Sequence, residues 1–236
     1  GIVAVGETIV IIAGGFDLNR DGIDDLAIGY SYAAIGDLYR SGRVFVLFGR
    51  PGGFPGVVDG ASLDGTDGFR IEGTRGGQYL GDSLADAGDV DHDGFDDLLL
   101  TQLMSKGSQE STSVVIHARS ARFPAATAIE DFIDGRNGFA VTIPGFPTLS
   151  IAAGLGDING DGFDDVGIAR PYDLSNPFDF GSRGSVYVVF GAAVPRPPRI
   201  AAADFDGRNG TRIDGSHPSG SAGRSLAGVG DFNGDD

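Results

Sequence analysis

The stretch DVDHDGFDD at residues 89–97 decides the fold, because close copies of it recur along the chain. The copies read DLNRDGIDD at residues 17–25, DINGDGFDD at residues 157–165 and DFNGDD at residues 231–236. Their first aspartates are 72, 68 and 74 residues apart. Repetition at such intervals is typical of an array of similar structural units.

Short apolar segments surround each copy in the same order. A segment of small apolar residues precedes the Asp-rich loop, and a second segment follows it at once, as in DDLAIGY from residue 24. A third segment, such as GRVFVLFG from residue 42, comes before a fourth, such as GFRIEG from residue 68. Segments rich in Val, Ile and Phe between Gly, Asp and Asn turns predict β-strands. Since no stretch has a capped helical stripe of apolar residues, we expect few helices.

Two segments near the ends of the sequence carry further strand predictions. GIVAVGETIVIIAGG at residues 1–15 lacks the basic start of a signal peptide, and we expect it to contain a buried strand. RSLAGVGD at residues 224–231 matches the segments that precede the other Asp-rich loops, so it is the expected first strand of a fourth unit.

Units of four short strands repeated along a chain predict an all-β fold, in which each unit is one four-stranded antiparallel blade of a β-propeller. The expected blades span about residues 6–75, 76–143 and 144–216, followed by a partial blade at residues 217–236. A β-solenoid is the structural alternative, but its repeats are much shorter. Because closed propellers have roughly four to eight blades, we expect further blades from a longer polypeptide, or otherwise from a neighbouring chain.

The repeated units resemble FG-GAP repeats, the blades of the integrin α-subunit propeller and of many bacterial surface proteins. The resemblance is carried by the Asp-rich loop, by Phe48-Gly49 and Phe190-Gly191 at the ends of the third segments, and by the Gly-Phe-x-(Ile/Val) start of the fourth. In the middle unit we expect Ala118-Arg119 to stand in place of Phe-Gly. The resemblance implies a seven-bladed ring, with the metal loops on one face and ligand contacts on the opposite face.

The Asp-rich loop has the donor pattern of a Ca²⁺ site. Ca²⁺ takes six to eight oxygen ligands, which positions 1, 3 and 5 of a tight loop can turn toward one point. Glycine at position 6 permits the sharp turn, after which position 7 offers its backbone carbonyl and position 9 a closing carboxylate. The predicted ligands are, in chain order, Asp17, Asn19, Asp21, Ile23 and Asp25; Asp89, Asp91, Asp93, Phe95 and Asp97; Asp157, Asn159, Asp161, Phe163 and Asp165; and, in an incomplete fourth loop, Asp231, Asn233 and Asp235.

Other interpretations of the loop fit less well. An EF-hand needs a bidentate Glu at position 12, where this chain has Ile28, Leu100 and Ile168. Turns that bind no metal would bring several carboxylates together without compensation, and Mg²⁺ demands a small octahedral shell. Without the bidentate Glu we expect a modest Ca²⁺ affinity. That affinity favours an extracellular or cell-surface location, with the periplasm as an alternative.

Composition excludes several classes of function. A formal net charge of −16 argues against nucleic acid as a partner, since phosphate binding needs clustered Lys and Arg. The absence of cysteine excludes disulfides, Cys-ligated zinc and a thiol nucleophile. No apolar run reaches the roughly 18 residues of a membrane span.

The sequence offers little for catalysis, and we predict no enzymatic activity. It has no nucleophile elbow, His-Glu-x-x-His or phosphate loop. His92 lies inside the second metal loop and is expected to face solvent, while His117 and His217 have no partner that the sequence identifies. The paired carboxylates, such as Asp24-Asp25, could suggest acid–base chemistry, but their repetition with the metal ligands favours a structural role.

Aromatic residues in the loops opposite the metal loops are the predicted partner surface, because exposed aromatic side chains often mark interaction surfaces. These residues are Tyr30, Tyr32, Tyr39, Tyr79, Phe146, Tyr172, Phe178 and Phe180. A protein ligand in cell adhesion and a glycan ligand both suit such a surface. The alternatives are a structural accessory subunit of an extracellular assembly, and a lectin-like or polysaccharide-active protein.

Overall fold

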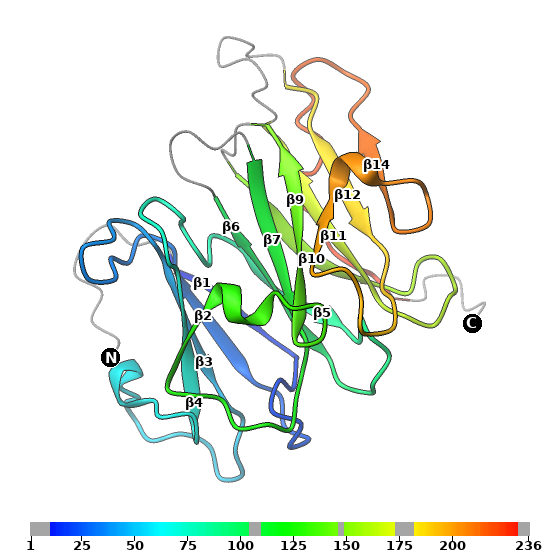
Figure 1. The fold of residues 1–236 in the computed structure, drawn as a ribbon. Helices are drawn as coiled ribbons and strands as arrows, with labels where there is room; N and C mark the ends of the chain where they lie inside the picture. Colours follow the sequence, from blue (N-terminus) through cyan, green and yellow to red (C-terminus); the bar gives the residue numbers. More distant parts are fainter. Residues whose placement is uncertain (1–9, 104–109, 146–148, 173–181, 231–236) are drawn as a thin grey trace.

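The described part of the chain forms three β-sheets that follow one another in sequence (Figure 1). The computed structural model describes residues 10–103, 110–145, 149–172 and 182–230. Within these ranges the helical structure consists of three short 3₁₀ turns, η1 (Gly60–Ser62), η2 (Ile129–Phe132) and η3 (Ala202–Asp204). The prediction of an all-β fold with few helices is confirmed.

Each sheet is built around four antiparallel strands in sequence order. The first contains β1 (Val10–Gly14), β2 (Leu26–Tyr30), β3 (Arg43–Leu47) and β4 (Gly68–Glu72). The second contains β5 (Leu84–Gly88), β6 (Asp97–Gln102), β7 (Glu110–Ile116) and β9 (Gly138–Pro144). The third contains β10 (Ile151–Gly156), β11 (Asp165–Arg170), β12 (Ser185–Val189) and β14 (Gly210–Asp214). β5, the first strand of the second sheet, contacts both β1 and β10, the first strands of the other two sheets. These three first strands therefore lie next to one another and are called the inner strands below.

A fifth strand extends two of the sheets, and the sequence did not predict it. The strand β8 (Ala126–Ala128) pairs in parallel with β4 of the preceding sheet, and β13 (Arg199–Ala201) pairs in parallel with β9. Each short strand lies just before a 3₁₀ turn of its own unit. Successive units are therefore joined by backbone pairing at their outer edges as well as by side-chain packing.

Two strand predictions near the ends of the sequence differ from the structure. Ile12 of β1 is 63% exposed and Val10 is 41% exposed, because described residues cover only the face of β1 that carries Ile11 and Ala13. Residues 224–230 form no strand, since each inner strand pairs with the strand that follows its metal loop and no such partner is among the described residues.

The apolar core lies between neighbouring sheets. Between the first and second sheets, Phe69 stacks on Phe123 with ring centroids 4.3 Å apart, and Phe48 and Phe132 pack against this pair. Each buried ring removes a large apolar surface from water and contributes roughly 1.5–3 kcal/mol. A second cluster, which includes Phe139, Val166 and Val189, fills the space between the second and third sheets.

Among the described residues, no helix is long and apolar enough to cross a membrane.

Candidate metal centres

All three complete Asp-rich loops have the same backbone path from the first to the second strand of their sheet. Position 4 is left-handed in each loop, with φ of 61° at Arg20, 58° at His92 and 75° at Gly160. Position 6 is left-handed as well and is always glycine, with φ of 82° at Gly22, 91° at Gly94 and 89° at Gly162. A side chain at position 6 would strain the turn, which explains the glycine predicted there.

Backbone amides hold the carboxylates of positions 1 and 5 inside each loop. The aspartate at position 1 accepts a hydrogen bond from the N–H of the position-6 glycine, at 2.7 Å in the first loop, 2.8 Å in the second and 2.7 Å in the third. The aspartate at position 5 accepts one from the N–H of position 7, at 2.9, 3.2 and 3.1 Å. Each carboxylate oxygen has two lone pairs, so these contacts leave acceptor capacity for a cation.

The aspartate at position 9 joins the metal loop to the end of the third strand. Asp25, Asp97 and Asp165 are each at most 2% exposed. One oxygen of each accepts a hydrogen bond from the N–H that follows the third strand: Gly49 at 2.8 Å, Ala118 at 2.9 Å and Gly191 at 2.9 Å. In the first and third loops the other oxygen accepts from the N–H of position 2, Leu18 at 2.9 Å and Ile158 at 3.1 Å.

These contacts correct the alignment of the middle unit. His117-Ala118, not Ala118-Arg119, occupies the place of Phe48-Gly49 and Phe190-Gly191. Ala118 donates to Asp97 as the two glycines donate to their aspartates, and the N–H of His117 donates to the Asn137 carbonyl at 3.0 Å as Phe48 does to Asp67 at 3.1 Å. The sequence prediction was wrong by one residue because neither His nor Ala matches the Phe-Gly pattern. Counting back from the fourth strand would not have corrected it, because Gly49 and Gly191 lie 19 residues before Gly68 and Gly210, whereas Ala118 lies 20 residues before Gly138.

Burial makes the position-9 carboxylates costly to ionise without a cation. Desolvation, assisted by Asp17 and Asp21, raises the pKa of Asp25 to about 7. Desolvation likewise raises the pKa of Asp97 and of Asp165 to about 6. In the second loop the carboxylate oxygens of Asp89, Asp91 and Asp93 lie within 4.8 Å of one another. An all-oxygen donor set with several carboxylates close together fits a hard divalent cation.

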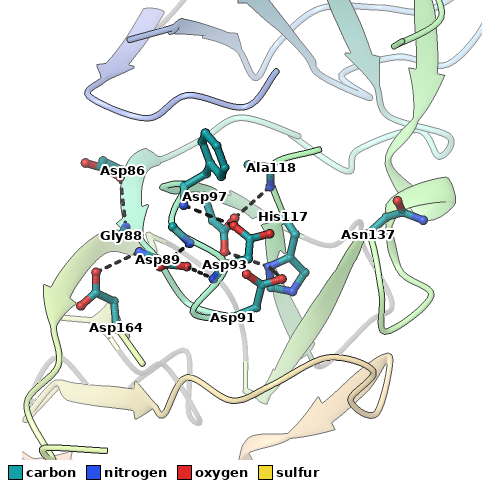
Figure 2. Close-up of polar contacts among 12 residues, drawn as sticks. Asp86, Gly88, Asp89, Asp91, Asp93, Asp97, His117, Ala118, Asn137 and Asp164 are labelled. Carbon is teal, nitrogen blue, oxygen red and sulfur yellow. Dashed lines mark hydrogen bonds and ion pairs between the residues drawn. The ribbon is translucent and has the colours of Figure 1, made fainter. Parts of the chain in front are cut away.

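The middle loop differs from the other two in the residue at loop position 3 and in the side chain that faces the loop. Asp91 stands where the other loops have Asn19 and Asn159, and it is 8% exposed. His117 faces both acids, with its Nδ1 2.8 Å from Asp97 Oδ2 and 3.6 Å from Asp91 Oδ2 (Figure 2). His117, for which the sequence identified no partner, therefore lies directly after β7 and against two acids of the second loop. His92, by contrast, is exposed as predicted.

Neighbouring metal loops contact one another. Arg20 of the first loop forms an ion pair with Asp93 of the second, donates to the Ala118 carbonyl at 2.6 Å, and lies 4.9 Å from the Phe95 ring centroid. The carboxylate of Asp164 accepts a hydrogen bond from the N–H of Asp89 at 2.9 Å. In the third loop, Asp164 thus contacts the loop of the neighbouring sheet, and Asp165 binds the N–H that follows the third strand of its own sheet.

The predicted partner residues divide into three groups. Tyr32, Tyr39 and Tyr79 surround Arg40, whose guanidinium lies 4.9, 4.8 and 5.8 Å from the three ring centroids. Tyr30 is 9% exposed and packs edge-on against Phe45, so it offers little surface to a ligand, while the half-buried Tyr172 lies 5.9 Å from Arg224. Phe146, Phe178 and Phe180, and the fourth-loop ligands Asp231, Asn233 and Asp235, lie outside the described residues.

The cluster around Arg40 and the first metal loop lie at opposite ends of the same strands. Gly14 pairs with Leu26 at the end of β1 and β2 that adjoins the metal loop. Val10 pairs with Tyr30 at the other end, and Tyr32 and Arg40 follow within the loop that leads to β3.

Four-stranded antiparallel sheets that succeed one another, each with an Asp-rich loop between its first two strands, are the blades of a β-propeller. The FG-GAP repeat family matches residues 10–47. The chain is 31% identical to integrin alpha-PS2 of Drosophila melanogaster over 72% of its own length and 12% of that protein. It is 27% identical to integrin alpha-3 of Cricetulus griseus over 64% of its length and 13% of that protein. It is also 32% identical to integrin alpha-X of Mus musculus over 58% of its length and 11% of that protein.

The chain thus contains an FG-GAP repeat and is integrin α-like over more than half of its length. It spans only about an eighth of the length of the integrin α subunits that it matches.

Proposed function

We propose that the chain is a calcium-binding β-propeller module of an extracellular or cell-surface protein, in which Ca²⁺ stabilises the loops between the first and second strands. The observation that carries this proposal is the recurrence of one donor arrangement in three successive loops. Each loop places carboxylate or amide side chains at positions 1, 3 and 5 and a buried carboxylate at position 9. The second loop has four carboxylates at these positions and the others have three.

Calcium binding would favour the folded state by mass action. Only the folded chain holds the position-9 aspartate against the other ligands, so a cation at 100 times its Kd would add about 2.7 kcal/mol per site. We expect excess chelator to lower the melting temperature and added calcium to restore it. Titration calorimetry of the chelated protein would count the sites. A melting curve that is the same in chelator and in calcium would exclude the structural role.

For the partner we propose a protein or glycan ligand in adhesion, bound at the cluster of Tyr32, Tyr39, Tyr79 and Arg40. Tyr39 is 66% exposed and its ring lies against the guanidinium of Arg40. Its hydroxyl and ring suit hydrogen bonding to a ligand and stacking on it. Similarity to integrin α subunits supports the adhesion role. Tyr39→Ala should abolish binding to immobilised matrix proteins or to a glycan panel, whereas His92→Ala, exposed among the metal loops, should not. Equal binding by both variants would move the ligand elsewhere.

We further propose that additional blades, from the same polypeptide or a neighbouring chain, cover both ends of the three-sheet array. Ile12 on β1 and Ile213 on β14 are 63% and 56% exposed, and exposed apolar faces of this kind mark interfaces. The blade limits predicted above remain our proposal, except that β9 runs through Pro144. Sedimentation analysis of the chain at increasing concentration would test this, since a chain that stays monomeric throughout would contradict association between copies.

A further inference from the structure

A buried cluster of two carboxylates and one imidazole lies beside the second metal loop. Asp91 and Asp97 both face His117, which comes from the end of β7 (Figure 2). Asp91 is 8% exposed, Asp97 is 0% and His117 is 2% exposed. One potential ligand atom from each residue lies within 4.8 Å of those of the other two.

The other two blades lack this cluster. At the place of His117 they have Phe48 and Phe190, and at the place of Asp91 they have Asn19 and Asn159. The middle blade therefore carries both changes together, an added carboxylate and an added nitrogen donor. A paired change in one blade of an array indicates a property that the array as a whole does not require.

Two polar atoms of the cluster have no hydrogen-bond partner among the described residues. These are Asp91 Oδ1 and His117 Nε2, and both are buried. An unsatisfied buried polar atom destabilises the folded state, so a native structure needs a reason to keep one. A cation beside Asp91 would satisfy its carboxylate directly.

We propose that Asp91, Asp97 and His117 bind a borderline divalent transition-metal ion, with Zn²⁺ as the best match. Zinc ligands lie about 2.0–2.2 Å from the metal, so two of them are roughly 3–4 Å apart. The separation of 3.6 Å from His117 Nδ1 to Asp91 Oδ2 agrees with this spacing, and the hydrogen bond of 2.8 Å to Asp97 Oδ2 would lengthen by less than about 1 Å as the ion replaces its proton. Imidazole nitrogen suits zinc and its neighbours in the transition series, whereas Ca²⁺ takes oxygen ligands.

The zinc site shares Asp91 and Asp97 with the proposed second calcium site but does not depend on calcium binding. Zinc and calcium would exclude each other at this loop, while the first and third loops, which lack a histidine, would keep their preference for calcium. The competing explanation is that His117 acts only as an internal counter-ion for the two acids. That explanation predicts no metal binding that depends on His117.

The test titrates chelator-treated protein with Zn²⁺ by calorimetry and with Co²⁺ by absorption, since the visible bands of Co²⁺ report its coordination geometry and should change when His117 is replaced. We expect one zinc equivalent in the parent protein, weakened more than about tenfold by His117→Phe. Phenylalanine is the residue of the sister blades, so this variant should fold. His117→Asn serves as a second variant without the imidazole. The controls His92→Ala and His217→Ala should keep the zinc equivalent, because these histidines lie outside the cluster.

Two results would overturn the zinc site: no zinc equivalent in the parent protein, or an unchanged equivalent in both His117 variants. Calcium titration of the same proteins separates this inference from the proposed function. If the parent protein binds one zinc equivalent, the His117 variants lose it, and all of them keep calcium at the first and third loops, both the zinc site and the calcium module are supported. If the His117 variants lose the zinc equivalent but neither they nor the parent protein bind calcium, the zinc site is supported and the calcium module is contradicted.

Discussion

Replacing Asp25 by asparagine should change stability very differently with and without calcium. Asp25 is 2% exposed, and burial raises its pKa from 3.8 to about 7. That rise corresponds to a cost of about 4 kcal/mol for keeping the carboxylate charged in the folded, metal-free protein at neutral pH. A neutral amide would remove this cost, but it would lose an acceptor for the N–H of Leu18 or Gly49, which costs about 1–3 kcal/mol. In excess chelator the free energy of unfolding should therefore rise by about 1–3 kcal/mol.

In calcium the same substitution should be harmful. A site filled at 100 times its Kd contributes about 2.7 kcal/mol, and a hundredfold loss of affinity would leave only about 0.4 kcal/mol. Urea unfolding of the variant should thus show a calcium-dependent gain about 2 kcal/mol smaller than in the parent protein. Asp24→Asn is the matched control, because Asp24 is the exposed neighbour and not a predicted ligand. An equal calcium-dependent gain in Asp25→Asn and the parent would show that Asp25 is only a hydrogen-bond acceptor.

Three further predictions concern packing, charge and pH. Phe123→Ala should lower the free energy of unfolding by about 3–5 kcal/mol, because the ring is 1% exposed and stacked on Phe69. The control Phe54→Ala should have little effect, since Phe54 is 46% exposed. Similar urea midpoints for the two variants would contradict the packing between sheets. Arg20→Ala should raise the calcium affinity of the second loop several-fold in titration calorimetry, since it removes the cation paired with Asp93; a lower affinity would refute this. Burial raises the pKa of Asp82 to about 6, so its favourable contribution is complete below about pH 4 and is lost as the pH rises toward 6. Asp82→Asn should flatten that part of the stability profile, and a parallel profile would contradict it.

The second, third and fourth strands of each unit could be predicted because their apolar residues and the turns between them are local signals. DDLAIGY, for example, contains β2 whole, and GRVFVLFG contains β3. The short strands β8 and β13 could not, since three residues such as Ala126–Ala128 carry no alternation of apolar and polar side chains. Their partners belong to the preceding unit, and such long-range pairing leaves no trace in a single sequence.

The ligand positions of the metal loops could be predicted from their spacing, but their surroundings could not. Nothing near Asp25 in the sequence indicates that its carboxylate accepts the N–H of Gly49, which lies 24 residues away. The same holds for the ion pair of Arg20 with Asp93, which joins two loops. The sequence could not identify a partner for His117, because only the sheet brings Asp91 and Asp97 beside it.

Contacts between loops make each metal centre part of the junction between sheets. The carbonyl of Leu18, at position 2 of the first loop, accepts the N–H of Arg119 at 2.9 Å, and the carbonyl of Val90, at position 2 of the second, accepts the N–H of Ala192 at 3.0 Å. Both donors directly follow the residue whose N–H binds the position-9 aspartate of their own loop. A cation that orders one loop would therefore also fix its position-2 carbonyl, which binds the next sheet. That contact would in turn fix the N–H that binds the position-9 aspartate of the next loop. If this coupling operates, loss of one site by substitution should weaken calcium binding at the adjacent loop.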